Sequence, residues 1–172
     1  LGWGGDASAT QPSLFVIEAD EYDTAFFDKR SKFVHYHPRT AILNNLEYDH
    51  ADIFPNLEAI ETQFHHLVRT VPRSGLIVAN GADANLARVL ARGCWSKAEY
   101  FSENKDWSYK SSSTNDGITI YRGNELAGEL RWDLLGEHNA MNAVAAIAAA
   151  HHAGVPIAKG IEALGKFENV KR

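Results

Sequence analysis

The sequence has 172 residues, which is enough for one domain with a hydrophobic core but too few for a typical multidomain enzyme. Apolar residues make up 45% and charged residues 23%, and no apolar run reaches the roughly 20 residues that a membrane-spanning helix needs. The net charge of -5, with scattered Lys and Arg, argues against a nucleic-acid partner. The single cysteine, Cys94, and the lack of a signal-peptide pattern favour a cytoplasmic protein.

The chain opens with residues 1–13, a run rich in Gly, Ser and Ala that is typical of a loop. Because position 1 is leucine, we expect these residues to come from within a longer gene product. Residues 14–172 are then expected to form one domain. Its first predicted strand is the continuous apolar run 14–17, which ends in the acidic segment 18–23.

The next elements alternate between strands and helices. Residues 40–43 are a second apolar run, and apolar residues at helical spacing over 56–71 predict an amphipathic helix. A third strand is expected at 75–79, followed by a short helix that Asp83 caps and that ends near residue 92. Helices between consecutive strands predict crossover connections, and hence a mostly parallel sheet flanked by helices.

The second half of the chain has a different texture. Between residues 99 and 135, short segments such as 117–121 and 129–132 predict small antiparallel strands. An Ala-rich helix is expected over 140–153 and a shorter one up to about residue 164. The predicted fold class is therefore α/β with a small antiparallel β segment. An exposed edge of such a sheet would favour self-association.

The first candidate site is a group of acidic residues after the strand at 14–17. Four carboxylates lie within six residues: Glu18, Asp20, Glu21 and Asp23. Ligands bind at the carboxyl ends of parallel strands, and Mg²⁺ needs only one or two protein carboxylates when phosphates supply further oxygens. The alternative is a solvated acidic loop.

A second candidate, Asp49-His50, follows the strand at 40–43 and could bring an imidazole to the same edge of the sheet. The alternative for His50 is a surface histidine without a ligand. The adjacent His65 and His66 lie within a predicted helix, where neighbouring side chains diverge, so they form no chelate. We expect them to be structural or to face a partner.

The third candidate is the segment 136–143, in which a glycine leads into the Ala-rich helix. Asn139 and Asn142 are three residues apart and share a helix face, and each amide offers the donor and the acceptor that an adenine edge requires. The alternative is that Asn139 only caps the helix.

Taken in order, the three segments resemble the signatures of the central domain of the Mur ligase family. They read EADEYD at 18–23, NLEYDH at 45–50 and GEHNAMNA at 136–143. The resemblance covers residues 14–172, and the runs 15–30 and 64–72 are most similar to the branch of the family that recycles murein peptides.

The resemblance implies a fold related to P-loop NTPases and an enzyme that uses ATP and Mg²⁺. The implied reaction joins UDP-N-acetylmuramate to L-Ala-γ-D-Glu-meso-diaminopimelate through an acyl phosphate, during peptidoglycan recycling. By the same resemblance, Glu18 and His50 are catalytic and ligate magnesium. Asn45 lines the same crevice, at the carboxyl ends of the strands. The adenine end of ATP would be held by three residues of the third segment: His138, Asn139 and Asn142.

The sequence departs from the family pattern in two places. The glycine-rich phosphate loop, G-x-x-G-K-[ST], is absent, because Gly165-Lys166-Phe167 lacks its glycine spacing and its hydroxyl residue. We expect that loop upstream and a peptide-binding domain downstream, so the N- and C-terminal domains of the parent chain are implied partners. Some relatives use a carbamylated lysine in the helix that follows the metal-binding histidine. The helix at 56–71 has no lysine, so either His65 or water replaces that group, or this branch functions without it.

Three interpretations remain open from the sequence. The first is the amide ligase, which as this chain alone is expected to be inactive. The second is another enzyme of the same fold, such as a ligase that adds glutamates to folate, or a two-metal phosphoesterase. The third is a module that binds nucleotide without catalysis.

Overall fold

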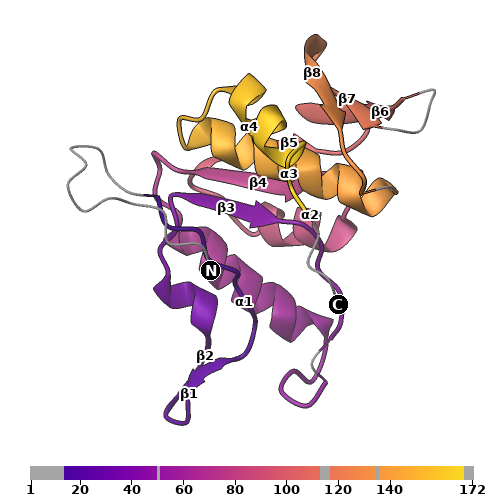
Figure 1. The fold of residues 1–172 in the computed structure, drawn as a ribbon. Helices are drawn as coiled ribbons and strands as arrows, with labels where there is room; N and C mark the ends of the chain where they lie inside the picture. The colour runs from indigo at the N-terminus through magenta and orange to yellow at the C-terminus, as the bar shows by residue number, and fades with distance from the viewer. Residues whose placement is uncertain (1–13, 50, 113–116, 135, 169–172) are drawn as a thin grey trace, which may run out of the picture.

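The computed structural model describes residues 14–49, 51–112, 117–134 and 136–168, and the predicted loop at 1–13 lies outside them. A six-stranded sheet in this part of the chain separates two layers of helices (Figure 1). The strands lie side by side in chain order: β3 (Thr40–Leu43), β4 (Leu76–Asn80), β5 (Lys97–Phe101), β6 (Trp107–Ser111), β7 (Gly117–Arg122) and β8 (Glu125–Arg131).

The parallel part of the sheet is built around β4, which pairs with β3 on one side and β5 on the other. Four consecutive β4 residues, Leu76 to Ala79, have at most 2% of their surface exposed. A strand buried on both faces reads as a continuous apolar run, and the predictions of strands at 40–43 and 75–79 are confirmed.

One face of the sheet is covered by α1 (Leu57–Thr70) and α2 (Ala84–Ala91). Asn56 caps α1 by accepting a 2.9 Å hydrogen bond from the Ala59 amide, and the apolar face of the helix packs against the sheet. Asp83 caps α2 as predicted, with its carboxylate accepting bonds from two amides at the helix start. Both helices thus have the boundaries that their caps and apolar spacing predict.

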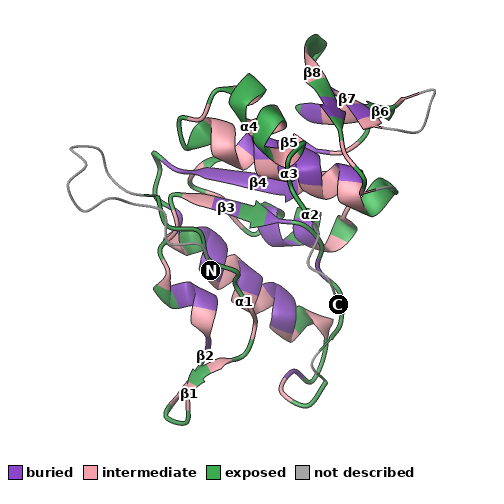
Figure 2. Cartoon of the chain, viewed as in Figure 1, coloured by how far each residue is buried: buried purple, intermediate pink, exposed green. Residues whose placement is uncertain are grey.

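The opposite face is covered by α3 (Glu137–His152), and α4 (Ile157–Leu164) packs against α3 and β8. The Ala-rich α3 buries small side chains against β4 and its neighbours, so the helix lies close to the sheet (Figure 2). It begins three residues before the predicted start because Gly136, with φ 100°, forms the turn that precedes it.

The antiparallel part consists of β6, β7 and β8, as predicted for this stretch of the chain. The prediction was wrong for β5, which is parallel to β4 and belongs to the main sheet. The strand has little apolar signal because Lys97 and Glu99 interrupt it, and the carboxylate of Glu99 is buried. That carboxylate accepts a 2.7 Å bond from the indole N–H of the fully buried Trp107 and pairs with Lys97 at 2.6 Å.

The predicted strand at 14–17 is wrong. Phe15 makes a single β-bridge, and the apolar side chains of this run are exposed, Val16 by 77%. A continuous apolar run becomes a buried strand only when neighbours pair with it and cover both its faces. Among the described residues β3 is the edge of the sheet, and no strand pairs on its other side.

Beyond this run the chain forms a small hairpin of β1 (Asp23–Ala25) and β2 (Asp28–Ser31), then the 3-10 helix η1 (Lys32–His35). The sequence did not predict these elements. The hairpin projects away from the sheet (Figure 1), and Phe26 and Phe27 at its tip are 94% and 91% exposed. None of the helices in the described ranges has the length and apolar character needed to span a membrane.

Replacing Glu99 with alanine should lower the free energy of unfolding by about 1–3 kcal/mol, because the buried Trp107 N–H then lacks an acceptor. Burial raises the pKa of Glu99, but the bonds from Lys97 and Trp107 together outweigh burial and lower it below 4.5. A lowered folded pKa stabilises the protein above the unfolded value, and this contribution is lost as the pH falls. Urea denaturation at about pH 7 and pH 3 should therefore show a smaller acid loss in the variant.

The matched control is Glu129→Ala, which removes an exposed carboxylate from β8. It should leave both the stability at neutral pH and the acid loss close to those of the native chain. A Glu99→Ala chain as stable as this control would contradict the role assigned to the buried carboxylate.

The edge of β3, which no described strand covers, and the exposed run 14–17 should make the 172-residue chain self-associate. We expect sedimentation velocity to show species larger than the monomer that grow with concentration. Val16→Lys combined with Ile42→Lys places charges along this edge and should restore the monomer. Phe27→Lys, at the hairpin tip, is the control, and a monomer produced by that change alone would place the contact at the hairpin instead.

Candidate functional site

Polar side chains gather where the parallel strands end. Asn44 and Asn45 follow β3, and Asn80 ends β4, with its side chain accepting a 2.9 Å bond from the Ala82 amide. The amide of Asn44 donates a 3.3 Å hydrogen bond to the side-chain oxygen of Asn142 in α3. The residue directly before the 45–50 segment therefore contacts the 136–143 segment at the carboxyl edge of the sheet.

The other candidate residues of these two segments lie nearby in the chain. Asn45 is exposed and donates a 3.3 Å bond to Glu47. His138 is exposed and Asn139 half-buried in the first turn of α3. The N-cap position of α3 is Gly136, and Asn139 is the third residue of the helix, from which a side chain can reach back to the helix start, so the capping alternative stays open.

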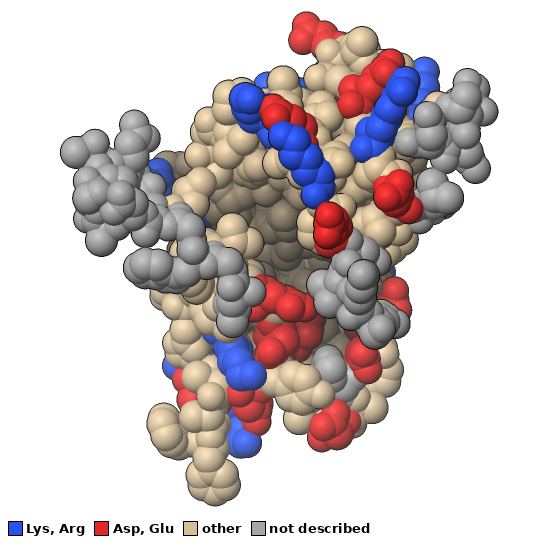
Figure 3. Space-filling view, viewed as in Figure 1, with Lys and Arg blue, Asp and Glu red and all other residues tan. Residues whose placement is uncertain are grey.

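The acidic segment divides into carboxylates with different partners. Asp23 pairs with Lys29 at 2.7 Å within the hairpin, and Asp20 lies 3.5 Å from Lys32, so that this second pair joins the segments on either side of the hairpin. Glu18 precedes these pairs in an exposed stretch without regular structure. Figure 3 shows acidic side chains gathered beside a hollow in this face of the molecule. The structure thus assigns Asp20 and Asp23 to local ion pairs.

His50, the second predicted magnesium ligand, lies outside the described residues. Within those residues, no three His, Cys, Asp or Glu side chains converge as a metal site would require. The pairing of Glu18 with His50 therefore stays a prediction. Exposed carboxylate and amide oxygens at this edge are the donor type that Mg²⁺ accepts, since it keeps several waters and takes oxygens from phosphates.

His65 and His66 face different neighbours in α1, as predicted. The His65 ring lies 6.0 Å from the Trp95 ring and its buried Nε2 has no hydrogen-bond partner among the described atoms. Partial burial, followed by the charge of Arg69, lowers the pKa of His66 and favours its neutral form. Neither observation makes the two a chelate.

Sequence reasoning missed two residues at this edge. Asn44 makes the contact with α3, and the doubled amide Asn44-Asn45 directly after a strand was the available signal. Asp83 was predicted only as a helix cap, yet its second carboxylate oxygen accepts a 2.9 Å bond from the Leu46 amide. That bond crosses from α2 to the segment after β3, and no local pattern announces it.

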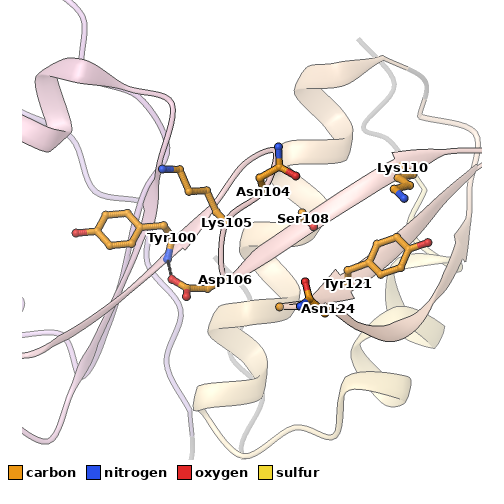
Figure 4. A pocket seen from close by; sticks show the side chains of 9 residues that line it. Tyr100, Asn104, Lys105, Asp106, Ser108, Lys110, Tyr121 and Asn124 are labelled. Carbon is orange, nitrogen blue, oxygen red and sulfur yellow. Dashed lines mark hydrogen bonds between the residues drawn. The ribbon is translucent and has the colours of Figure 1, made fainter.

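Two hollows lie elsewhere. One of about 280 Å³ adjoins the start of α3 and includes Tyr109 and Glu137, where burial first and then the Glu137 charge raise the pKa of Tyr109. The other, of about 610 Å³, lies on the side of the antiparallel strands that α3 does not cover, with Lys105, Lys110 and Tyr121 among its residues (Figure 4). The smaller hollow is lined in part by Gly136, Glu137 and Ala140 of the third candidate segment, but His138, Asn139 and Asn142 are not among its lining residues.

A mostly parallel sheet between two layers of helices, with polar side chains at the carboxyl ends of its parallel strands, is the arrangement in which open α/β domains bind ligands. The family model described as "Mur ligase middle domain" matches residues 6–150. The chain belongs to the Mur ligase family, which confirms both the predicted family and the fold class.

Two curated relatives share one enzyme name. The chain is 51% identical over 172 residues to UDP-N-acetylmuramate--L-alanyl-gamma-D-glutamyl-meso-2,6-diaminoheptandioate ligase of Haemophilus influenzae, covering 99% of this chain and 38% of that protein. It is 54% identical to the Escherichia coli enzyme of that name, and the match covers 94% of this chain and 36% of that protein. The crystal structure of UDP-N-acetylmuramate:L-alanyl-gamma-D-glutamyl-meso-diaminopimelate ligase from Neisseria meningitides matches with a TM-score of 0.89 and 58% identity, over 95% of this chain and 50% of that one. The chain thus spans just over a third of the length of these two curated relatives.

Proposed function

We propose that the full-length protein is an ATP-dependent ligase that joins UDP-N-acetylmuramate to L-alanyl-γ-D-glutamyl-meso-diaminopimelate. The proposal rests on identity above 50% to enzymes of that name over almost all of this chain. The observation that supports it in the structure is the Asn44–Asn142 contact, which brings the residue directly before the 45–50 signature segment to the 136–143 segment at one edge of the sheet. We place the reaction in the cytoplasm, where ATP is available.

The proposed reaction has two steps. The carboxylate of UDP-N-acetylmuramate attacks the γ-phosphorus of ATP, forming an acyl phosphate and releasing ADP. The amine of the peptide then attacks the acyl carbon, phosphate leaves, and the amine nitrogen loses a proton. Catalysis of phosphoryl transfer depends chiefly on positioning and on neutralising negative charge.

The residues of this chain would divide these tasks by position. Glu18 and His50 would hold magnesium, which supplies positive charge against the phosphate oxygens when bound. Asn45 would line the crevice between nucleotide and substrate. The adenine end of ATP would lie against the first turns of α3, where the amide of Asn142 is already oriented by Asn44. The remaining adenine contacts would come from His138 and Asn139.

Glu18→Ala and His50→Ala in the full-length protein should each reduce peptide-dependent ADP release on the order of 100-fold. A lost metal ligand removes about 3 kcal/mol of charge stabilisation, and each 1.36 kcal/mol corresponds to a factor of ten. The measurement is ADP release with Mg²⁺, UDP-N-acetylmuramate and the tripeptide, with each substrate omitted in turn.

The matched control is Asp23→Asn, which changes a carboxylate of the same segment that pairs with Lys29 rather than facing the proposed metal. It should keep activity within a few-fold of the native protein. Release of ADP that ignores the tripeptide would refute the substrate assignment, and release of phosphate from simple esters without ATP would favour a phosphoesterase instead.

The 172-residue chain alone should show no ligase activity. It lacks the G-x-x-G-K-[ST] loop whose backbone amides and lysine hold nucleotide phosphates, and phosphoryl transfer fails without that positioning. The check is the same ADP assay on the isolated chain, with the full-length protein as positive control. Tripeptide-dependent ADP release by the chain would show that it positions phosphates by other means.

A further inference from the structure

We propose that Asp83 and Asn85 form a backbone clamp on Leu46 that positions the segment carrying the magnesium-ligand candidate His50. The inference rests on the proposed function, because that function gives His50 its role. Asp83 and Asn85 would act as positioning residues and would touch neither metal nor substrate.

The clamp holds both backbone groups of one residue. The Leu46 amide donates to the Asp83 carboxylate at 2.9 Å, and the Leu46 carbonyl accepts from the Asn85 side-chain amide at 2.5 Å. The Leu46 side chain is 1% exposed and belongs to the core between the sheet and α1. Leu46 is therefore fixed by its backbone and its side chain, although it lies in no strand or helix.

Asp83 performs two tasks with its two oxygens. While one oxygen accepts from Leu46, the other accepts from the Asn85 and Leu86 amides at 2.8 and 2.9 Å and caps α2. The start of α2 and the segment after β3 consequently share one carboxylate. A serine in this position could still cap the helix, but its one side-chain oxygen would not accept both the bonds from α2 and the bond from Leu46.

Ion pairs around the buried Glu61 hold the second arm of the clamp. The Asn85 side-chain oxygen accepts a hydrogen bond from Arg88, which also pairs with Glu61 of α1 at 2.7 Å. Glu61 is 5% exposed and binds Arg92 at 2.6 Å through its other oxygen. Because Arg88 occupies the oxygen of Asn85, the amide nitrogen of Asn85 is directed at Leu46. The path from α1 to the segment after β3 is thus one chain of hydrogen bonds.

The clamped residue stands where a small displacement matters. Asn45, beside it, is proposed to line the crevice, and Asn44 reaches Asn142 of the proposed adenine site. Two residues further on, the Tyr48 hydroxyl donates to the Phe54 carbonyl at 3.0 Å. A metal ligand tolerates little displacement, and outer residues that orient ligands typically change metal affinity 10–100-fold when altered.

The test compares Asp83→Ser, Asn85→Asp and the native sequence in the full-length protein, with Asn56→Ser as control. Serine at position 83 retains the cap of α2 but loses the bond to Leu46. Aspartate at position 85 retains the acceptor for Arg88 but cannot donate to the Leu46 carbonyl. Asn56→Ser makes a similar cap change in α1 away from Leu46. Thermal unfolding of each variant reports any general loss of stability.

The first readout needs neither metal nor activity: hydrogen exchange at the Leu46 amide, followed by NMR or by mass spectrometry of short peptides. We expect native exchange to be on the order of 100-fold slower than in an unstructured chain, and this protection to fall at least tenfold in Asp83→Ser. The second readout is the Mg²⁺ concentration that gives half-maximal ADP release, which should rise about tenfold in both clamp variants and stay unchanged in the control.

The outcomes separate the clamp from the proposed function. No tripeptide-dependent ADP release by the native protein would overturn the proposed function and, with it, the role of the clamp in holding His50. An active native protein with an unprotected Leu46 amide would overturn the clamp alone. So would loss of protection in Asp83→Ser at an unchanged Mg²⁺ requirement, because the clamp would then only stabilise the fold.

Discussion

The structure depends on the burial of β4 on both faces. Its four core residues, Leu76 to Ala79, have at most 2% of their surface exposed, which is possible only with helices above and below and a strand on either side. Parallel pairing then requires crossover helices and brings the carboxyl ends of β3 and β4 to one edge. The position of Asn44 beside Asn142 of α3 follows from this arrangement, as does the reach of Asp83 across to Leu46.

The elements that the sequence predicted well carry their own local signals. The caps Asn56 and Asp83 and the Ala-rich run of α3 mark their helices, and β4 is apolar throughout. Failures came where long-range pairing decides the structure. The run 14–17 has the composition of a buried strand but no flanking strands among the described residues, and β5 carries a charge whose partner, Trp107, lies in another strand.

The candidate site shows the same division. Residue type and spacing were enough to single out the acidic segment and the start of α3 as candidates, and both lie within the residues that the family model matches. They could not tell which carboxylates form ion pairs, because Lys29 and Lys32 reach Asp23 and Asp20 only after the hairpin folds. Asp83 was recognised by its local role, whereas its bond to Leu46 spans 37 residues and is visible only in three dimensions.

The hydrophobic cores on the two faces of the sheet can form at different times during synthesis. The core between the sheet and α1 and α2 is drawn from residues 33–90, so it can assemble soon after α2 leaves the ribosome. The other core buries Leu76 and Val78 beneath α3, whose last residue is His152. Until some sixty further residues have been made, that side of β4 has no cover in the nascent chain, and since translation adds about 5–20 residues per second, the interval lasts several seconds. In those seconds the apolar face of β4 is the part of this domain that a chaperone would meet.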